Sequence, residues 1–207
     1  MTRALIDRLT ALYDAGHAGP VDGLHVDWRI APEGGLRPAA VLIAVTDRGD
    51  DHPEGPGVLM IHRPSHMRAH PGQAAFPGGK IDPGETPIEA ALREAYEELG
   101  VRPQDVHVIG ASDQFRTGTG YDITPVLAVV PGGLVLDPNP AEVAGWFEPP
   151  IGYVLDPVNQ AVKFAETGGK QRSYVEIVWR EHRIWGVTGG IIANLSRRIA
   201  WEPFTHG

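Results

Sequence analysis

The sequence predicts an α+β fold in which helices flank a mixed β-sheet. Two runs of apolar and β-branched residues, Ala39–Thr46 and Val58–Arg63, are typical of core strands, and an acidic loop that contains proline separates them. A third segment, Pro87–Leu99, has the spacing and the end signals of a helix. Strand and helix patterns alternate without the regular spacing of repeated β-α-β units, which disfavours a doubly wound parallel sheet.

The other elements follow from weaker local patterns. Leucines at positions 5, 9 and 12 predict a short N-terminal helix over residues 3–14. A connector rich in glycine and proline follows over Gly16–Gly35, and the turn-rich segment Pro64–Gly79 cannot form one regular element. A closing helix is predicted over Ile191–Ile199. Further strands are predicted at Val106–Ala111, Ile123–Val130, Tyr174–Trp179 and Arg183–Trp185.

Composition limits the classes of function. The chain has 207 residues, of which 42% are hydrophobic, which suits a single domain with a sizeable core. Its 26 acidic and 18 basic residues give a formal net charge of −8, so a broad basic surface for nucleic acid is not expected. The absence of cysteine excludes disulfides, thiolate metal sites and cysteine nucleophiles. The longest apolar run is far shorter than the about 18 residues of a membrane span, and the N-terminus lacks a signal-peptide core, so we expect a cytoplasmic protein.

The helix predicted over Pro87–Leu99 has signals at both ends. Thr86 is in the N-cap position, Pro87 is the first helical residue, and Glu89 completes a capping box. Gly100 follows the last helical residue, as is common at a helix C-terminus. The buried face of this helix is predicted to consist of Ile88, Ala91, Leu92, Ala95 and Leu99.

Three carboxylates share one face of the same helix. Glu94, Glu97 and Glu98 are spaced at i, i+3 and i+4, so they lie within one turn and raise each other's pKa by repulsion. One interpretation is a solvated face on which Arg93 pairs with Glu97. The other is a site for a divalent cation, and ligands that are all oxygen favour magnesium or manganese over zinc.

The segment Gly79–Val101 resembles the Nudix box, whose pattern is Gly-x5-Glu-x7-Arg-Glu-U-x-Glu-Glu-x-Gly-U, with U a bulky aliphatic residue. The residues that match the pattern are Gly79, Glu85, Arg93, Glu94, Glu97, Glu98, Gly100 and Val101. Ala95 stands where the pattern has a bulky aliphatic residue, a departure that affects packing rather than chemistry. The resemblance implies one Nudix domain over residues 1–207, an α/β/α sandwich around the mixed sheet.

The resemblance also implies roles for the box residues. Enzymes of this family catalyse the attack of water on a nucleoside diphosphate that is linked to another group. Glu94 or Glu98 would accept the proton of that water, and the sequence leaves this choice open. Glu85 and Arg93 would orient the ligands of catalytic magnesium or manganese ions. The implied ligands are Glu94, Glu97, Glu98 and the backbone of Gly79.

The segment before the box, Leu59–Gly79, resembles the accessory motif of coenzyme A diphosphatases. The matching residues are Leu59, Arg63, Arg68, Gly72, Phe76, Pro77, Gly78 and Gly79, while Met60, Ile61 and Pro64 depart from the motif. The resemblance implies hydrolysis of coenzyme A or its acyl derivatives to 3′,5′-ADP and 4′-phosphopantetheine or its acyl form. Guanidinium groups suit phosphate oxygens, and the implied substrate contacts are Arg63, Arg68, Phe76 and Gly78.

Two other functional interpretations remain open. The enzyme could act on another nucleoside diphosphate derivative, such as ADP-ribose or NADH, or the chain could be a non-catalytic Nudix module that binds a nucleotide. Three repelling acids argue against the second of these, because a binding module has little need of them. We expect a small-molecule nucleotide as partner, no nucleic acid and no membrane, and the sequence leaves a homodimer open.

Overall fold

A pair of long parallel strands forms the centre of the protein. The structure is a computed structural model that describes residues 1–25, 35–49, 51–64, 72–167 and 170–201. Strands β1 (Arg37–Asp47) and β8 (Tyr121–Pro131) are parallel along all 11 residues of each. The strands that extend this sheet pair antiparallel with β1 or β8, and they are β2 (Gly57–Val58), β5 (Gly78–Lys80), β6 (His107–Ala111) and β7 (Phe115–Arg116). The predicted mixed sheet is therefore confirmed.

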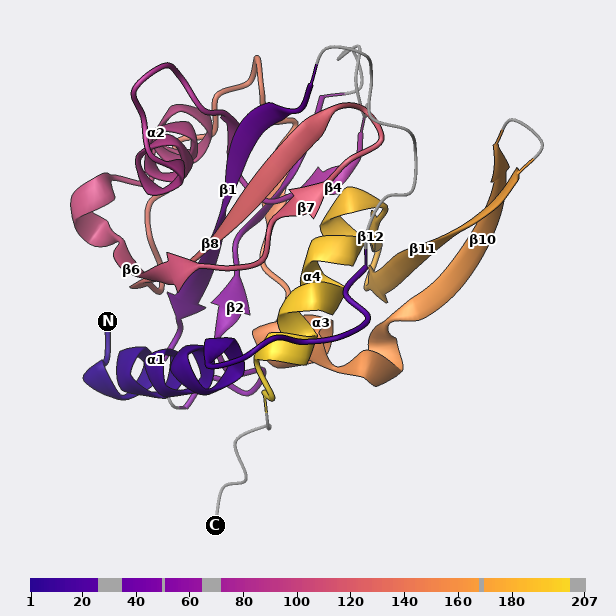
Figure 1. The fold of residues 1–207 in the computed structure, drawn as a ribbon. Coiled ribbons are helices and arrows are strands. Elements are labelled where there is room, and N and C mark those ends of the chain that lie inside the picture. The colour runs from indigo at the N-terminus through magenta and orange to yellow at the C-terminus, as the bar shows by residue number, and fades with distance from the viewer. Residues whose placement is uncertain (26–34, 50, 65–71, 168–169, 202–207) are drawn as a thin grey trace.

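Helices cover both faces of this sheet (Figure 1). Helix α2 (Pro87–Leu99) lies on one face, and α4 (Val187–Arg198) and α1 (Arg3–His17) lie on the other. Successive residues of a strand point to opposite faces, so Leu42 of β1 packs on the α2 side and Ile43 packs on the α4 side. This arrangement confirms the predicted α/β/α sandwich. None of the helices that the structure describes has the length and apolar composition needed to cross a membrane.

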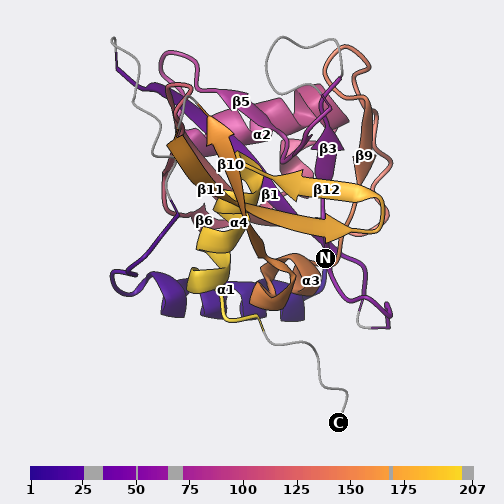
Figure 2. The ribbon, with the colours of Figure 1, turned by 90° about the vertical axis from the view of Figure 1, so that its right-hand side faces the viewer.

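Two smaller antiparallel sheets complete the fold (Figure 2). The first has the strand order β4-β3-β9, and the second has the order β10-β11-β12 and lies over α4. The short helix α3 (Ile151–Leu155) follows β9. The strands of these sheets are β3 (Met60–His62), β4 (Ala74–Ala75), β9 (Gly145–Phe147), β10 (Ala161–Thr167), β11 (Lys170–Trp179) and β12 (His182–Trp185).

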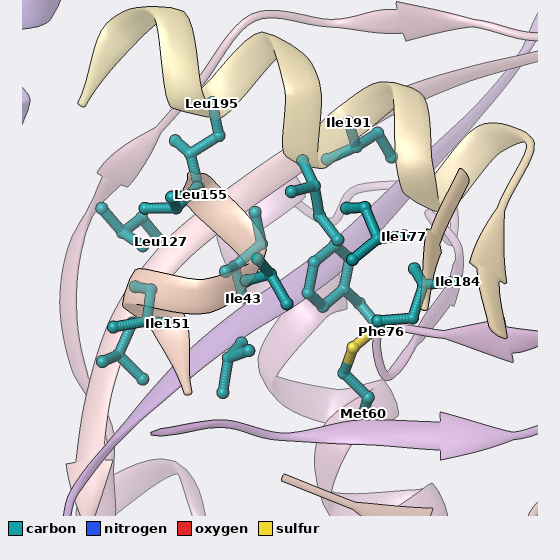
Figure 3. Packing of buried hydrophobic residues seen from close by; sticks show 14 of the residues in the cluster. Ile43, Met60, Phe76, Leu127, Ile151, Leu155, Ile177, Ile184, Ile191 and Leu195 are labelled. Atoms are coloured by element: carbon teal, nitrogen blue, oxygen red, sulfur yellow. The ribbon is translucent and has the colours of Figure 1, made fainter. Parts of the chain in front are cut away.

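The larger hydrophobic core lies on the α4 side and contains Phe76. This side chain is only 4% exposed, and Figure 3 shows its ring beside Met60, Ile177 and Ile184 beneath α4. The sequence analysis assigned Phe76 to substrate contact. The structure places this ring among apolar side chains of the core, where its packing is the role that the contacts show, and a substrate contact by Phe76 stays a prediction.

Several element boundaries differ from the sequence-based expectations. The predicted strand Val58–Arg63 is divided between β2 and β3, which belong to different sheets. Helix α4 begins earlier than predicted, because it includes Gly189 and Gly190. A Cβ atom at Gly189 would lie 2.5 Å from the carbonyl oxygen of Val175, so glycine lets the helix approach β11 closely. Strands β9 and β10 and helix α3 were not predicted.

Replacing Thr86 by alanine should lower the free energy of unfolding by about 1 kcal/mol. The Thr86 hydroxyl oxygen accepts the N–H of Glu89 at 3.2 Å, and alanine leaves that donor at the helix start without its partner. Urea unfolding followed by circular dichroism measures the change, and Thr86→Ser, which keeps the hydroxyl, serves as the control. Equal stability of Thr86→Ala and the wild type would show that the cap does not stabilise α2.

Candidate active site

Helix α2 is fixed at both ends, which sets the direction of its carboxylates. The capping box is complete, because the Glu89 carboxylate accepts the N–H of Thr86 at 2.8 Å while the Thr86 hydroxyl accepts the N–H of Glu89. At the other end Gly100 adopts a left-handed conformation with φ of 71°, and its N–H bonds back to the carbonyl oxygen of Tyr96. The bounds of this helix agree with the prediction.

Two glycines of β5 lie directly against the carboxylates of α2. The N–H of Gly78 donates a hydrogen bond of 2.9 Å to Glu98 Oε2. A Cβ atom at Gly78 would lie 2.4 Å from the carbonyl oxygen of Ala40, and one at Gly79 would lie 2.4 Å from Glu94 Oε1. Only glycine therefore allows the backbone, the central strand and the two carboxylates to pack this closely.

A third carboxylate joins this pair from a distant part of the chain. Carboxylate oxygens of Glu94, Glu98 and Glu142 lie within 4.8 Å of one another. Glu142 lies in a turn that begins at Asn139, whose N–H donates to the carbonyl oxygen of Glu98 at 2.9 Å. The Asn139 amide donates in turn to Glu142 Oε1 at 3.3 Å. This turn attaches to the C-terminal end of α2 and so carries Glu142 to the other two acids.

Burial makes the charged form of this cluster unfavourable. The Glu98 residue is 3% exposed, and desolvation raises the pKa of its carboxyl to about 8, with a further contribution from the negative charge of Glu94. Desolvation also raises the pKa of Glu94. A hard divalent cation would remove both penalties, and three converging carboxylates are the oxygen ligands that Mg²⁺ and Mn²⁺ prefer. The residues present thus fit the predicted metal.

Arg93 holds the rest of the site together. Its guanidinium binds both oxygens of Glu85, at 2.7 and 3.0 Å, and donates to Glu94 Oε1 at 2.9 Å and to the carbonyl oxygen of Lys80 at 2.9 Å. These bonds, above all the pair to Glu85, raise the pKa of Arg93 and lower the pKa of Glu85. Arg93 therefore stays charged and connects α2 to the turn before it, an orienting position for both Arg93 and Glu85.

Glu97 occupies a different environment from the other two glutamates of α2. Its side chain is 48% exposed, and its Oε2 accepts a hydrogen bond of 3.1 Å from Arg93. It lies outside the three-carboxylate cluster that the described residues form. Its predicted role as a metal ligand stays a prediction.

Arg63 is the arginine of the accessory motif that the structure describes, and its charge acts on the carboxylate cluster. It follows β3, its backbone pairs with Gly72 and Gln73, and its positive charge acts on the carboxyl of Glu98. Its Nε is buried and has no hydrogen-bond partner among the described residues. Arg68, the second predicted phosphate contact, lies outside the described residues.

Glu142 is the functional candidate that sequence reasoning missed. The Asn139-Pro140 pair before it is a turn signal, and Asn139 Oδ1 accepts the N–H of Ala141 at 3.1 Å, as in an Asx turn. That signal predicts a turn, but nothing local indicates that the turn folds back onto α2. Glu142 therefore becomes a candidate only when the tertiary structure is known.

An open cleft of about 610 Å³ lies at the far end of β1, around Asp47 and Arg48. The arginines that line it are already paired, because Arg48 bonds to Glu148 at 2.7 Å and Arg180 bonds to Glu54 at 3.0 Å. No carboxylate cluster of the kind found beside α2 occurs there among the described residues. The α2 site is thus the better candidate for chemistry on a diphosphate.

Comparison with known proteins agrees with this assignment. Residues 36–170 match the NUDIX domain family. The chain is 38% identical over 172 residues to NudL, described as an uncharacterized Nudix hydrolase, from Enterobacter sp. strain 638, with 81% of this chain and 85% of the relative covered. It is 39% identical over 170 residues to NudL from Escherichia fergusonii, with the same coverage.

Among solved structures, the fold is similar to the Nudix hydrolase RenU from M. smegmatis. The TM-score is 0.50 with 28% sequence identity, and the match covers 66% of this chain and 84% of that one. Enzymes of this family generally need a divalent metal, which agrees with the cluster beside α2. This chain belongs to the NUDIX family and is a hydrolase that acts on the diphosphate bond of a nucleoside diphosphate derivative.

Proposed function

We propose that this Nudix hydrolase cleaves the diphosphate bond of coenzyme A or its acyl derivatives, with Mg²⁺ or Mn²⁺ as cofactor. The products would be 3′,5′-ADP and 4′-phosphopantetheine or its acyl form. The position of Arg63 carries the proposal, because the charge of this accessory-motif residue acts on Glu98 and its buried Nε has no hydrogen-bond partner among the described residues. A guanidinium whose positive charge acts on the carboxylate cluster suits a substrate rich in phosphate.

The residues of the site divide the chemistry between them. Glu94, Glu98 and Glu142 would hold the cation, which would supply positive charge that neutralises the diphosphate and promotes the attack of water. A carboxylate of this cluster takes one proton from the water while the water oxygen bonds to one phosphorus. The bond between that phosphorus and the bridging oxygen breaks, and the bridging oxygen leaves with the other phosphate. Arg63 binds the phosphate oxygens, and Arg93 keeps Glu94 in place.

We further propose that the second half of the accessory motif selects the substrate. Coenzyme A carries a 3′-phosphate that ADP-ribose and NADH lack, and we assign Arg68 to that group on the motif alone. ADP-ribose and NADH are the alternative substrates. A homodimer and a cytoplasmic location are further parts of this proposal, and neither enters the chemistry of the site.

A panel of diphosphates tests the choice of substrate. With Mg²⁺ or Mn²⁺ present, coenzyme A should be cleaved faster than ADP-ribose or NADH, and mass spectrometry should find 3′,5′-ADP and 4′-phosphopantetheine. Dephospho-coenzyme A is the matched control for the 3′-phosphate. Intact coenzyme A beside rapid cleavage of ADP-ribose would refute the substrate assignment and leave the family unchanged.

Replacing Glu98 by glutamine should reduce kcat by about 100-fold or more, because it removes one charge from the metal cluster while a side-chain oxygen can still accept the N–H of Gly78. Glu97→Gln should abolish turnover if Glu97 also binds the metal in the working enzyme. Asp7→Asn, at an exposed carboxylate of α1, is the control. Thermal unfolding shows that each variant is folded, and full activity of Glu98→Gln would remove the argument for the metal site.

Metal binding should release a proton at neutral pH. The pKa of Glu98 is about 8, so its carboxyl is mostly protonated at pH 7 and must lose that proton to bind a cation. Calorimetric titration of the protein with Mn²⁺ in buffers of different ionisation enthalpy measures the release, which should be close to one proton at pH 7 and fall towards zero above pH 9. Glu98→Gln should lower the release, and an unchanged value in this variant would contradict the assignment.

A further inference from the structure

Trp146 is an exposed aromatic residue on a strand that is otherwise packed. Its side chain belongs to β9 and the residue is 45% exposed, whereas the next residue, Phe147, is 5% exposed. Strand β9 lies at the edge of the β4-β3-β9 sheet, beside β3 (Figure 2). An indole at this position contributes little to the core, so its aromatic ring is accessible to a ligand.

The strand register places Trp146 on the same side of the sheet as the carboxylates. Trp146 pairs with Ile61, and directly opposite residues of an antiparallel pair share a face. Ile61 is fully buried in the core on the α2 side. The neighbouring pair, Met60 and Phe147, belongs to the core on the α4 side. The ring of Trp146 therefore faces the layer that contains α2.

The path of the chain also keeps Trp146 close to the catalytic cluster. Glu142 precedes it by four residues, which limits the distance between their Cα atoms to at most about 14 Å. The N–H of Ala144, midway between them, donates to the carbonyl oxygen of His62 at 2.8 Å, which joins this segment to the residue before Arg63. The segment that carries Trp146 therefore also carries Glu142 and is hydrogen-bonded to the residue before Arg63, so Trp146 lies within the reach of a nucleoside whose phosphates are held there.

We propose that Trp146 stacks against the nucleobase of the substrate. The inference rests on the proposed function only in requiring a nucleoside diphosphate derivative as substrate. A diphosphate held by the cluster and Arg63 leaves its base one ribose away, and the flat, exposed face of an indole is suited to receive it. Stacking tolerates any base, so Trp146 would contribute affinity, and the phosphate contacts would contribute the choice among adenine nucleotides.

Trp146→Ala should raise KM for the cleaved nucleotide by about tenfold or more and leave kcat nearly unchanged, because the residue is distant from the reacting atoms. Trp146→Phe, which keeps an aromatic face, should restore most of the affinity. The matched control is Tyr96→Ala, at an aromatic residue that is 55% exposed. Tyr96 is two residues from both Glu94 and Glu98, which turns it about 200° away, to the opposite face of α2.

A binding experiment decides the proposal independently of the substrate. Titration with ADP and Mn²⁺ should quench the tryptophan fluorescence of the wild type and bind Trp146→Ala about tenfold or more weakly, while inorganic pyrophosphate should bind both proteins equally. Equal affinity of both proteins for ADP would overturn the proposal. Weaker binding of 4′-phosphopantetheine alone by Trp146→Ala would also overturn it. Failure of the proposed function would appear separately, as intact coenzyme A with the wild-type enzyme.

Discussion

The close contact between two glycines of β5 and the carboxylates of Glu94 and Glu98 is the constraint on which the site depends. Gly78 donates to Glu98, and the backbone of Gly79 lies where any Cβ atom would collide with Glu94. Burial raises the pKa of Glu98 to about 8, so the fold holds an acid that favours its neutral form until a cation arrives. The capped helix and the pairing of β5 with β1 keep the acids in this unfavourable arrangement. A bound divalent cation would offset the free-energy cost of burying these acids, and this favours cation binding.

Local signals were sufficient to predict the half of the site that lies on α2. Its cap, its proline and its final glycine are all within the helix or next to it, and the helix has the predicted bounds. Glu142 could not be predicted, because its position depends on the hydrogen bond between Asn139 and the carbonyl oxygen of Glu98. Phe76 shows the opposite case, since a residue that fits a functional motif lies in the core. A motif indicates which residues a family retains, but the reason can be packing.

Local sequence patterns also could not predict which strands belong to the same sheet. The apolar run Val58–Arg63 has the composition of one strand, yet Leu59 bonds to the carbonyl oxygen of Ala44 between two short strands of different sheets. Strand β10 has exposed side chains on both faces where they are described, so it lacks the alternation that marks a half-buried strand. Its pairing with β11 supplies the order that its own sequence does not indicate. Composition predicts burial, whereas the identity of the partner strand depends on contacts that are distant in sequence.

Successive side chains of β3 and β9 point to opposite faces, so one face packs the core on the α4 side and the other faces the carboxylates. Met60 and Phe147 face the core on the α4 side, while Ile61 and Trp146 face the side that carries the carboxylates. A shift of one residue in this register would place Trp146 in the core and Phe147 at the site, so the packing of one face determines what the other face presents. The core thus positions Arg63, Glu142 and Trp146 relative to one another even though none of them contributes to it. Affinity for the nucleotide can therefore change by substitution at a position such as 146 without disturbing the residues that keep the carboxylates together.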